Sequence, residues 1–453
     1  MQRISEPSAT LFLIGCLACY LAPDLVSLSY ALDGLVYANI ANLLAQGEGS
    51  FWYLPYYVTE VVRFVDHPPL GIYIQSLTMA VINTDWWVDK LYTTILIGLF
   101  FLGCFHLGRL HPTHQYWPVL LLLSLVPLST YTLKNGFLEV PLSIAIMGSV
   151  WAVMKAYRKL WWALLASALM IGAVMIKGPV GLFPLVAPMV YLVIVTPSKT
   201  NIVRATSITS IMGVGLLACL GIGVLSADIT SWLQHYLSGQ VLDSITGARP
   251  AEHGRLYLLY HLFVSLAIIT ICAALLGGRF STFNKTTVFW LLLGLAFVIP
   301  LLLSARQYRH YLLPALPFFV LAANSLIPAL SANSRVSQVL NRMLKLTWWA
   351  PITIGLVLAV YHWGKPGDHV DDLDDAQTIA STVQQTTVGF CSPELSLSAY
   401  LYRHHNIKTT HSNQAWVVCK HLPGPSFTHR LDLSDGVSLW HKPRTSDHTH
   451  NNN

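Results

Sequence analysis

Long apolar segments recur along almost the whole of this 453-residue chain, and they constrain its fold more than any other feature. Each has about 17 residues or more, close to the length at which a helix crosses a hydrocarbon core of about 30 Å. Lipid offers no hydrogen-bonding partner to the backbone, so such segments are expected to be helices. The segments are residues 8–28, 90–108, 116–132, 137–154, 160–176, 179–195, 206–225, 257–276, 286–303, 311–330 and 346–362. The sequence therefore predicts an all-α polytopic integral membrane protein with about 11 transmembrane helices.

Charge is sparse, and its placement predicts the topology. Only 11% of the residues are charged, whereas soluble domains average about 25%. Basic clusters occupy alternate gaps between the apolar segments, and by the positive-inside rule those gaps face the cytoplasm. The pattern is consistent only if residues 69–83 are re-entrant or interfacial. We therefore interpret the net charge of +6 as topology and expect no nucleic-acid partner.

The predicted outer face contains a long polar loop directly after the first apolar segment. Residues 33–70 are rich in Asp, Glu, Tyr and Trp. Loops longer than about 15 residues in compact proteins are usually functional or disordered, and the aromatic residues argue against disorder. We expect surface helices and part of a functional site within the outer loop 33–89.

The residues after 362 are polar and form the second predicted domain. Residues 371–385 have the acidic start that suits a helix N-terminus, and 386–391, 415–420 and 436–442 have the composition of short strands. This predicts a small extramembrane α/β domain over 363–453 with a disordered tail. Its two cysteines, Cys391 and Cys419, can pair if the domain faces an oxidising compartment.

Several ionisable residues near the predicted outer face have both a functional and a structural interpretation. Asp33 is either a general base or an interfacial helix cap. Lys134 and Glu139, which bracket a turn, either serve a function, as ionisable groups at membrane depth usually do, or form a structural ion pair with each other. Lys177 either reaches an anion or extends to the membrane surface.

Two further groups have the same ambiguity. Asp66 and His67, ahead of two prolines, either bind a metal ion or a phosphate or belong to a rigid turn. Basic residues also gather in the later outer loops, where together they suit a phosphate-bearing lipid, although each one alone is more typical of an interfacial anchor. The cluster comprises Arg249, His253, Arg255, Arg306, Arg309 and His310.

The order of these motifs resembles the protein O-mannosyltransferase and aminoarabinose transferase superfamily, which has the GT-C fold and uses polyprenyl-phosphate sugars. The matching motifs are residues 33–38 (D-E-x-x-Y-A type), 66–70 (K-P-P-L type after an acidic residue), 133–139 (A-R-x-x-x-x-D type), 176–179 (T-K-G-P type) and 309–317 (K-x-x-Y-x-L-P-x-x-P type). The chain departs from the pattern at Gly34, His67, Lys134 and Glu139, where the family has an acidic residue, a lysine, an arginine and an aspartate.

The resemblance implies a role for each matching residue. The catalytic residues would be Asp33, as the base, and Glu139, and the donor phosphate would bind Lys177, Arg249, Arg255 and Arg309. The acceptor and the rest of the site would involve Tyr37, Lys134, His67 and Tyr311. A divalent metal ion, if one is used, would bind Asp66 and His253. No nucleotide cofactor is expected, because the sugar arrives on a lipid carrier.

The resemblance also implies a substrate class and a location. A GT-C catalytic domain at 1–362 would transfer a sugar, with inversion, from a polyprenyl-phosphate (undecaprenyl-phosphate) donor to an acceptor such as lipid A, a protein or an envelope glycan. The site and the C-terminal domain would lie on the periplasmic side of a bacterial inner membrane. The alternatives are a transporter or flippase of lipid-linked sugars and a non-catalytic scaffold. A transporter predicts polar residues deep in the membrane and internal repeats.

Overall fold

The computed structural model groups the chain into two compact units. The first comprises residues 1–26, 65–75 and 90–363, and the second comprises 27–64, 76–89 and 364–453. The structure describes residues 6–57, 61–109, 115–243, 253–254, 256–279, 283–328, 342–383, 385–392, 394–411 and 414–443. Arg249, Arg255 and the predicted disordered tail lie outside these residues. The second unit thus includes parts of the outer loop. The predicted division into a catalytic domain at 1–362 and an extramembrane domain at 363–453 stays a prediction.

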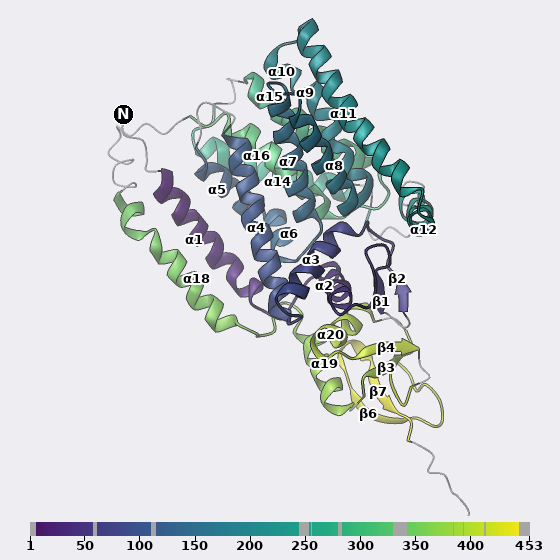
Figure 1. Cartoon of the computed structure of the whole chain (residues 1–453). Coiled ribbons are helices and arrows are strands. Elements are labelled where there is room, and N and C mark those ends of the chain that lie inside the picture. The colour runs from purple at the N-terminus through teal and green to yellow at the C-terminus, as the bar shows by residue number, and fades with distance from the viewer. Residues whose placement is uncertain are drawn as a thin grey trace, which may run out of the picture. The chain divides into compact units, whose positions relative to one another are not determined.

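The first unit is helical (Figure 1). Its helices, some of which begin or end in the second unit, are α1 (Glu6–Leu25), α3 (Leu70–Val81), α4 (Trp86–Gly108), α5 (Trp117–Leu125), α6 (Pro127–Lys134), α7 (Glu139–Ala156), α8 (Trp162–Lys177), η1 (Gly178–Val186), α9 (Ala187–Val190), α10 (Leu192–Val195), α11 (Lys199–Gly223), α12 (Ala227–Tyr236), η2 (Leu237–Leu242), α14 (Tyr257–Leu275), α15 (Lys285–Leu303), η3 (Arg309–Ala315), α16 (Leu316–Asn324) and α18 (Trp349–His362). The prediction of an all-α polytopic membrane protein is confirmed.

The number of membrane crossings differs from the 11 apolar segments. Among the described residues, eight helices are long and apolar enough to cross a membrane, or nine if the α5–α6 pair is one bent span. The segments 160–176 and 179–195 form one continuous candidate span, Trp162–Val195. Helix α16, within the segment 311–330, has only nine residues. The count of 11 spans therefore stays unconfirmed.

A sharp bend separates α5 from α6. The two helices meet at 86°, and the residue between them, Val126, has the extended conformation φ −83°, ψ 111°. Proline restricts the residue before it to extended conformations and cannot donate a helical hydrogen bond. Pro127 therefore ends α5 and begins α6 in a new direction.

Helix α3 supports the prediction that residues 69–83 do not cross the membrane. It has 12 residues, which at about 1.5 Å per residue extend for only about 18 Å. A hydrocarbon core of about 30 Å is longer than this.

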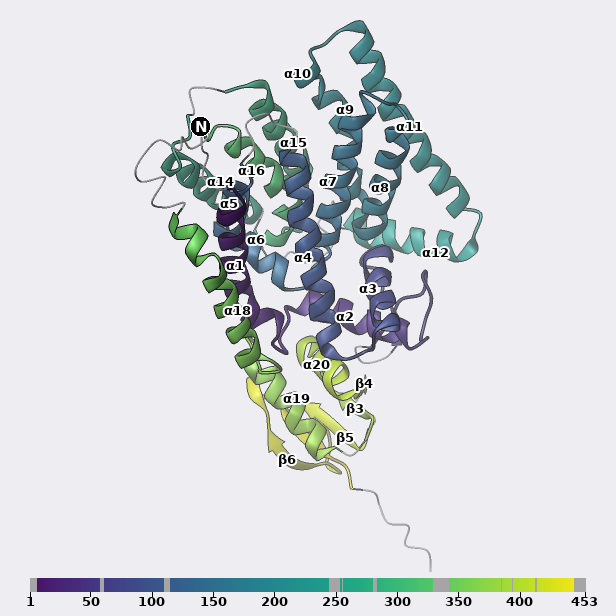
Figure 2. The ribbon, with the colours of Figure 1, turned by 60° about the vertical axis from the view of Figure 1, so that its left-hand side comes forward.

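Small residues allow close packing between several helices of the first unit. In both views α1 and α18 run side by side (Figures 1 and 2). A β-carbon at Gly15 would lie 2.9 Å from the Ile352 side chain, and one at Gly355 would lie 3.2 Å from the backbone of Cys19. Small residues at such crossings let backbones approach in the absence of a hydrophobic driving force.

The second unit contains a five-stranded sheet. The strand order is β4-β3-β5-β7-β6, with β3 parallel to β4 and β5 and with β7 antiparallel to β5 and β6. Its elements are α2 (Leu32–Ala45), β1 (Pro55–Tyr57), β2 (Val61–Arg63), α19 (Val370–Thr382), β3 (Thr387–Phe390), α20 (Leu395–His405), β4 (Lys408–His411), β5 (Trp416–Cys419), β6 (Thr428–Asp432), η4 (Ser434–Gly436) and β7 (Ser438–His441). The predicted α/β architecture is confirmed, and the three predicted strands are β3, β5 and β7.

One apolar core joins the helices of the second unit to its sheet. It includes Leu35 of α2, Ile379 of α19, Tyr400 of α20 and Val388 and Val418 of the sheet. Cys391, after β3, forms a disulfide with Cys419 at the end of β5. The pairing that the sequence allowed therefore occurs in the structure.

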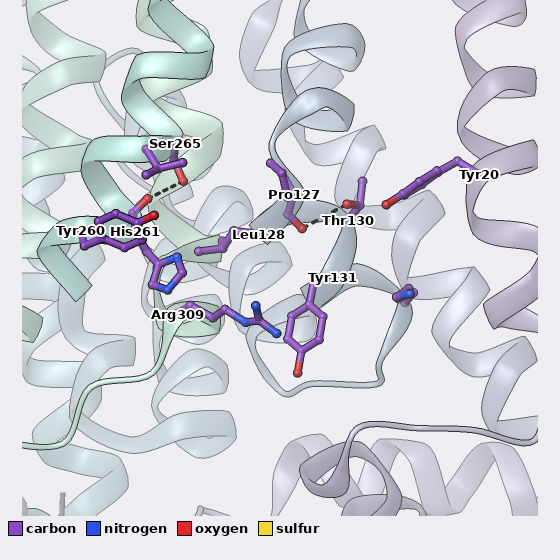
Figure 3. Close-up of a pocket in the computed structure, with 11 residues that line it drawn as sticks. Tyr20, Pro127, Leu128, Thr130, Tyr131, Tyr260, His261, Ser265 and Arg309 are labelled. Atoms are coloured by element: carbon purple, nitrogen blue, oxygen red, sulfur yellow. Dashed lines mark hydrogen bonds between the residues drawn. The ribbon is translucent and has the colours of Figure 1, made fainter. Parts of the chain in front are cut away.

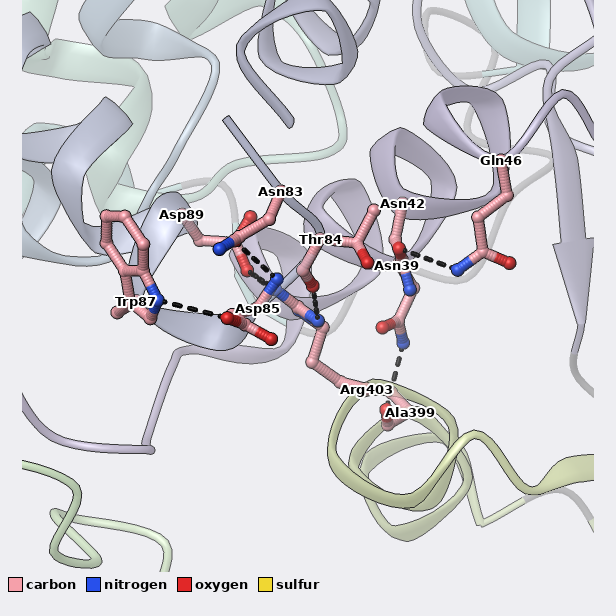
Figure 4. A network of polar contacts seen from close by, with 10 residues as sticks. All are labelled: Asn39, Asn42, Gln46, Asn83, Thr84, Asp85, Trp87, Asp89, Ala399 and Arg403. Carbon is pink, nitrogen blue, oxygen red and sulfur yellow. Dashed lines mark hydrogen bonds and ion pairs between the residues drawn. The ribbon is translucent and has the colours of Figure 1, made fainter. Parts of the chain in front are cut away.

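Polar contacts within the second unit hold the outer-loop segments against α20 (Figure 4). The Asn39 amide of α2 donates to the carbonyl of Ala399 at 2.9 Å. Arg403 donates through Nε to Asp89 Oδ2 at 2.7 Å and through Nη1 to the carbonyl of Thr84 at 2.9 Å. Outer-loop segments on both sides of α3 are thereby fixed to the same C-terminal helix.

Candidate functional site

A buried ion pair lies at the junction of two helices in the first unit. Glu139 is the first residue of α7 and Lys177 is the last of α8, and their side chains form a hydrogen-bonded ion pair. A carboxylate at a helix N-terminus and an ammonium at a C-terminus both suit the helix dipoles. Glu139 is only 1% exposed, and its Oε2 has no hydrogen-bonding partner among the described residues. A buried oxygen in this state costs free energy, so Glu139 is a candidate for a functional role.

The short helix η3 packs against this pair. His310 Nε2 lies 3.6 Å from Glu139 Oε1, and its ring stacks on Phe137 at 4.5 Å. Burial is the main influence on His310 and lowers its pKa below the usual value, so the imidazole is neutral at pH 7 and Lys177 alone neutralises Glu139. The Lys177 ammonium also lies 4.7 Å from the centre of the Tyr311 ring. Two consecutive residues of η3 thus contact the ion pair.

The chain can place Lys177 here because the next residue is glycine. Gly178 has φ +66°, a conformation that other residues rarely adopt. A β-carbon at this position would also collide with the hydroxyl of Tyr236 in α12. The sequence Lys177-Gly178-Pro179 is therefore explained locally by a tight turn beside α12.

A cavity of about 370 Å³ adjoins η3 (Figure 3). Arg309 lines it, with its guanidinium 3.8 Å from the centre of the Tyr131 ring. Among the residues that the structure describes, no carboxylate lies within ion-pair distance of Arg309. The other lining residues are Tyr20, Pro127, Leu128, Thr130, Lys134, Tyr260, His261, Val264 and Ser265. A half-buried guanidinium of this kind is suited to bind a phosphate or carboxylate.

Five of the predicted site residues come together around η3. Glu139, Lys177 and Tyr311 form the buried cluster, whereas Lys134 and Arg309 line the cavity. The structural ion pair considered between Lys134 and Glu139 does not form, so that alternative is wrong. Lys134 pairs with Asp24 and Glu139 pairs with Lys177, because helix packing places Lys134 and Glu139 apart.

Lys134 pairs instead with a residue of the first helix. Its ammonium lies 2.8 Å from Asp24 Oδ1. Asp24 is in the last turn of α1, and Lys134 ends α6. The bend at Pro127 thus directs α6, with its lysine and Tyr131, toward α1 and the cavity.

The residues predicted to hold a metal ion are separately engaged. Asp66 accepts a hydrogen bond from the Gln240 amide in η2. His253 stacks on Tyr257 at 3.9 Å and lies 5.8 Å from the Tyr308 ring. Across the described part of the chain, no three His, Cys, Asp or Glu side chains are grouped so that they can hold a metal ion. The predicted metal-binding role of Asp66 and His253 therefore stays a prediction, and we derive no step through a metal.

Among the remaining predicted residues, Asp33 and Tyr37 belong to the second unit and His67 belongs to the first. Asp33 is exposed in the first turn of α2. Tyr37, on the same helix, is 4% exposed and lies edge-to-face with Phe64 at 6.2 Å. His67 is half-buried in the turn before α3. Their predicted roles as base and acceptor contacts stay predictions.

Several residues around the site were not expected from the sequence. Tyr131, Phe137, Tyr236 and His261 each contact a site residue or line the cavity. Aromatic residues near membrane surfaces are common, so nothing in the sequence distinguishes these from ordinary interfacial residues. Asp24 differs, because the sequence could have identified it as an ionisable residue at the end of the first apolar segment.

Comparisons with known proteins identify the fold. No family model and no curated protein sequence matches the chain. Its structure is similar to that of ArnT from Cupriavidus metallidurans in the apo state, with a TM-score of 0.60, 13% identity and coverage of 96% of this chain and 97% of that chain.

Two other solved structures extend this comparison. ArnT from the same organism bound to undecaprenyl phosphate has a TM-score of 0.62, 12% identity and coverage of 97% and 99%. The apo oligosaccharyltransferase of Archaeoglobus fulgidus has a TM-score of 0.50 and 11% identity, over 90% of this chain and 64% of that chain. The chain therefore has the fold of ArnT over nearly all of its length, and the fold that the motif resemblance implied is confirmed.

Proposed function

We propose that this protein is a membrane glycosyltransferase that takes a sugar from a polyprenyl-phosphate donor. The observation that carries the proposal is the cavity beside η3, where Arg309 has no carboxylate partner among the described residues, within a fold that in ArnT binds undecaprenyl phosphate. The guanidinium can form two parallel hydrogen bonds to a phosphate. The buried Glu139–Lys177 pair fixes the short helix that carries it.

The proposed reaction is a single displacement at the anomeric carbon. An acceptor hydroxyl or phosphate oxygen forms a bond to this carbon while the bond to the polyprenyl phosphate oxygen breaks and its electron pair leaves with the phosphate. Arg309 stabilises the negative charge on the leaving phosphate. The proton of a hydroxyl acceptor passes to a carboxylate, and Asp33 is the candidate base from the motif comparison. One displacement inverts the anomeric configuration.

The disulfide supports an extracytoplasmic location for the C-terminal residues. Cys391 and Cys419 are paired in the second unit, and disulfides persist mainly in oxidising compartments such as the bacterial periplasm. We therefore propose that the second unit and the site face the periplasm from the inner membrane. The acceptor there would be lipid A, a protein or an envelope glycan.

The test uses the purified protein in lipid nanodiscs with a radiolabelled undecaprenyl-phosphate sugar and an envelope extract. We expect label to move from the donor to one acceptor class, which mass spectrometry of the products identifies. Asp33→Asn should lower this rate about 10²- to 10⁴-fold, as loss of a general base does. Asp374→Asn, at an exposed aspartate on α19, is the matched control and should keep the wild-type rate.

A flippase would behave differently in the same system. In sealed vesicles it would move the labelled lipid between leaflets without breaking the bond between sugar and phosphate. Intact donor after full exchange between leaflets would contradict the proposed transfer, and so would full activity of Asp33→Asn.

A further inference from the structure

The connection between α7 and α8 lies at the opposite end of these helices from the Glu139–Lys177 pair. In both views the two helices run side by side (Figures 1 and 2), and the pair joins the start of α7 to the end of α8. Helix α7 is a candidate span of 18 residues, which at about 1.5 Å per residue extend for about 27 Å. This is close to the thickness of a hydrocarbon core, about 30 Å. Residues 157–161 therefore lie at the membrane surface opposite the buried pair.

This connection is strongly basic. Arg158 and Lys159 are exposed within it, and Lys155 is half-buried in the last turn of α7. No aspartate or glutamate occurs in the sequence between Glu139 and Asp228. Among the described residues, no carboxylate lies within ion-pair distance of the three basic side chains. An anion that reaches the connection therefore meets three positive charges that no described acidic side chain neutralises.

Three tryptophans lie directly beside these charges. The Trp161 and Trp162 rings stack at 4.2 Å, and Trp151 of α7 lies edge-to-face with Trp162 at 5.0 Å. The Lys155 ammonium lies 5.5 Å from the centre of the Trp151 ring, a distance at which a cation and an aromatic face attract each other. Trp161 is 56% exposed. Indole rings are enriched at the level of the lipid headgroups, so the three cations lie at headgroup depth.

The backbone of the connection is held in an ordered turn. The carbonyl of Lys155 accepts hydrogen bonds from the amides of Arg158 and Lys159 at 3.0 and 3.1 Å. The Tyr157 hydroxyl donates to the carbonyl of Pro188 in α9 at 2.5 Å. A preorganised turn lowers the entropic cost of binding a ligand. The positive-inside rule explains the sign of these charges, but it requires neither the turn nor the tryptophan stack.

We propose that the α7–α8 connection binds one anionic phospholipid in the leaflet opposite the candidate site. The Arg158 guanidinium forms two parallel hydrogen bonds to the headgroup phosphate, and the two lysines add point charges. The acyl chains lie against Trp161 and Leu164, which is 65% exposed in the first turn of α8. A zwitterionic headgroup brings its own positive group next to three cations, so a headgroup of net negative charge is preferred. This lipid is not a reactant, so its binding does not depend on the proposed sugar transfer.

The first experiment measures lipid binding by the delipidated protein in a neutral detergent. Native mass spectrometry counts the bound lipids as phosphatidylglycerol, or phosphatidylcholine with the same acyl chains, is added. We expect the first phosphatidylglycerol to bind at least about tenfold more tightly than phosphatidylcholine. Soluble glycerol phosphate should not displace it, because it lacks the acyl chains. Equal affinities for the two lipids, or displacement by glycerol phosphate, would overturn the proposal.

A charge-matched pair of variants tests where the lipid binds. Arg158→Gln/Lys159→Gln should weaken phosphatidylglycerol binding about 10- to 30-fold, since each basic residue near an anionic lipid contributes about a factor of five. Lys199→Gln/Lys345→Gln removes two exposed charges at the starts of α11 and of the candidate span Arg342–His362. This control should keep the wild-type affinity. Equal losses in both variants would mean attraction to the whole basic surface and would rule out the site.

Tryptophan quenching locates the acyl chains independently of charge. In phosphatidylcholine nanodiscs that contain a small fraction of brominated phosphatidylglycerol, the wild type should be quenched more than random lipid contacts predict. Trp161→Phe should lose most of this excess quenching. Trp349→Phe, at a 53% exposed residue of α18, is the matched control and should keep it. An unchanged excess in Trp161→Phe would place the lipid elsewhere and contradict the proposal.

Discussion

The two units each contain a buried carboxylate paired with a basic residue, but the unpartnered buried atom is on the arginine in one pair and on the carboxylate in the other. Asp89 and Glu139 are both 1% exposed. In the second unit, Arg403 lies within ion-pair distance of Asp89 Oδ2 through two nitrogens, and it donates hydrogen bonds through Nε to this oxygen at 2.7 Å and through Nη1 to the carbonyl of Thr84 at 2.9 Å. Its Nη2 has no partner in hydrogen-bonding geometry among the described residues. In the first unit, Glu139 uses one oxygen, and its Oε2 has no partner among the described residues.

This difference indicates different roles. Arg403 joins two segments, because it contacts both Asp89 and the carbonyl of Thr84, and removing one partner of a buried pair is costly. Glu139 has a buried oxygen without a partner among the described residues, which costs free energy, and its ion pair contacts η3. We therefore infer that Asp89–Arg403 anchors the outer-loop segments to α20, whereas Glu139–Lys177 positions η3 for function.

The largest expected effect is on the stability of the second unit. Arg403→Met leaves Asp89 buried without its partner, and breaking such a pair costs about 3–5 kcal/mol. Thermal melting in detergent, followed by tryptophan fluorescence, should show a clear decrease in the melting midpoint. Arg430→Met, at an exposed arginine on β6, should melt like the wild type. A wild-type melting curve for Arg403→Met would remove the anchoring role.

The disulfide should stabilise the same unit by a comparable amount. It closes a sequence separation of 28 residues, for which the chain-entropy model gives about 3.5 kcal/mol. Replacing both Cys391 and Cys419 by serine should lower the melting midpoint, and a reductant should do the same to the wild type. The double variant should then be insensitive to the reductant. Further destabilisation of that variant by the reductant would contradict the assignment of the effect to this bond.

The sheet of the second unit shows which elements a sequence pattern can predict. The three predicted strands, β3, β5 and β7, are the central ones, and the two unexpected strands, β4 and β6, are the edges. The edge strands are the segments KTTH and THRLD. Edge strands are often polar because one side faces solvent, so they lack the apolar pattern on which strand prediction depends.

The candidate site was predictable in its residues but not in its pairings. Charge close to apolar segments identifies Lys134, Glu139 and Lys177, and a basic cluster in the later outer loops identifies Arg309. Their partners depend on how separate helices pack, and hydropathy does not contain that information. The bend at Pro127 was available from the sequence, because proline restricts the residue before it. By contrast, composition cannot distinguish the single span 162–195 from two short ones.

The next effect tests whether the Glu139–Lys177 pair is functional. Lys177→Met alone leaves Glu139 charged and buried and should destabilise the protein. The double variant Glu139→Gln/Lys177→Met removes both charges and should regain most of the stability. We expect its sugar transfer to remain about 10- to 100-fold below wild type, or about 1.4–2.8 kcal/mol in the activation barrier, because η3 is no longer fixed.

Melting and transfer measurements on the same samples separate the two roles. Full recovery of transfer in the double variant would make this pair structural, like Asp89–Arg403. The contrast between the two units would then disappear.

A change at the cavity itself should affect binding without affecting stability. Arg309→Met removes a charged hydrogen-bond donor, and such bonds contribute about 1.5–3 kcal/mol. The affinity for fluorescent undecaprenyl phosphate should therefore fall about 10- to 100-fold, with an unchanged melting midpoint. Lys199→Met, at the exposed start of α11, is the control. Equal losses in both variants would indicate nonspecific attraction of the anionic lipid.

The smallest expected effect is on the pH dependence of stability. Of the two buried pairs, only the Glu139 cluster should produce it, through the protonation of His310. Burial lowers the pKa of His310 in the folded protein, whereas the unfolded value is about 6.5. Between these two values the unfolded state binds more protons, so the stability is present above about pH 6.5 and is lost as the pH falls. The loss of stability is at most about 1.4 kcal/mol per pH unit for one proton.

The melting midpoint of His310→Gln should therefore depend less on pH than that of the wild type between pH 7 and 5.5, while Arg403→Met should keep the wild-type pH dependence. Equal slopes for His310→Gln and the wild type would mean that the histidine is not held neutral beside Glu139, and that the buried pair of the first unit tolerates a second positive charge.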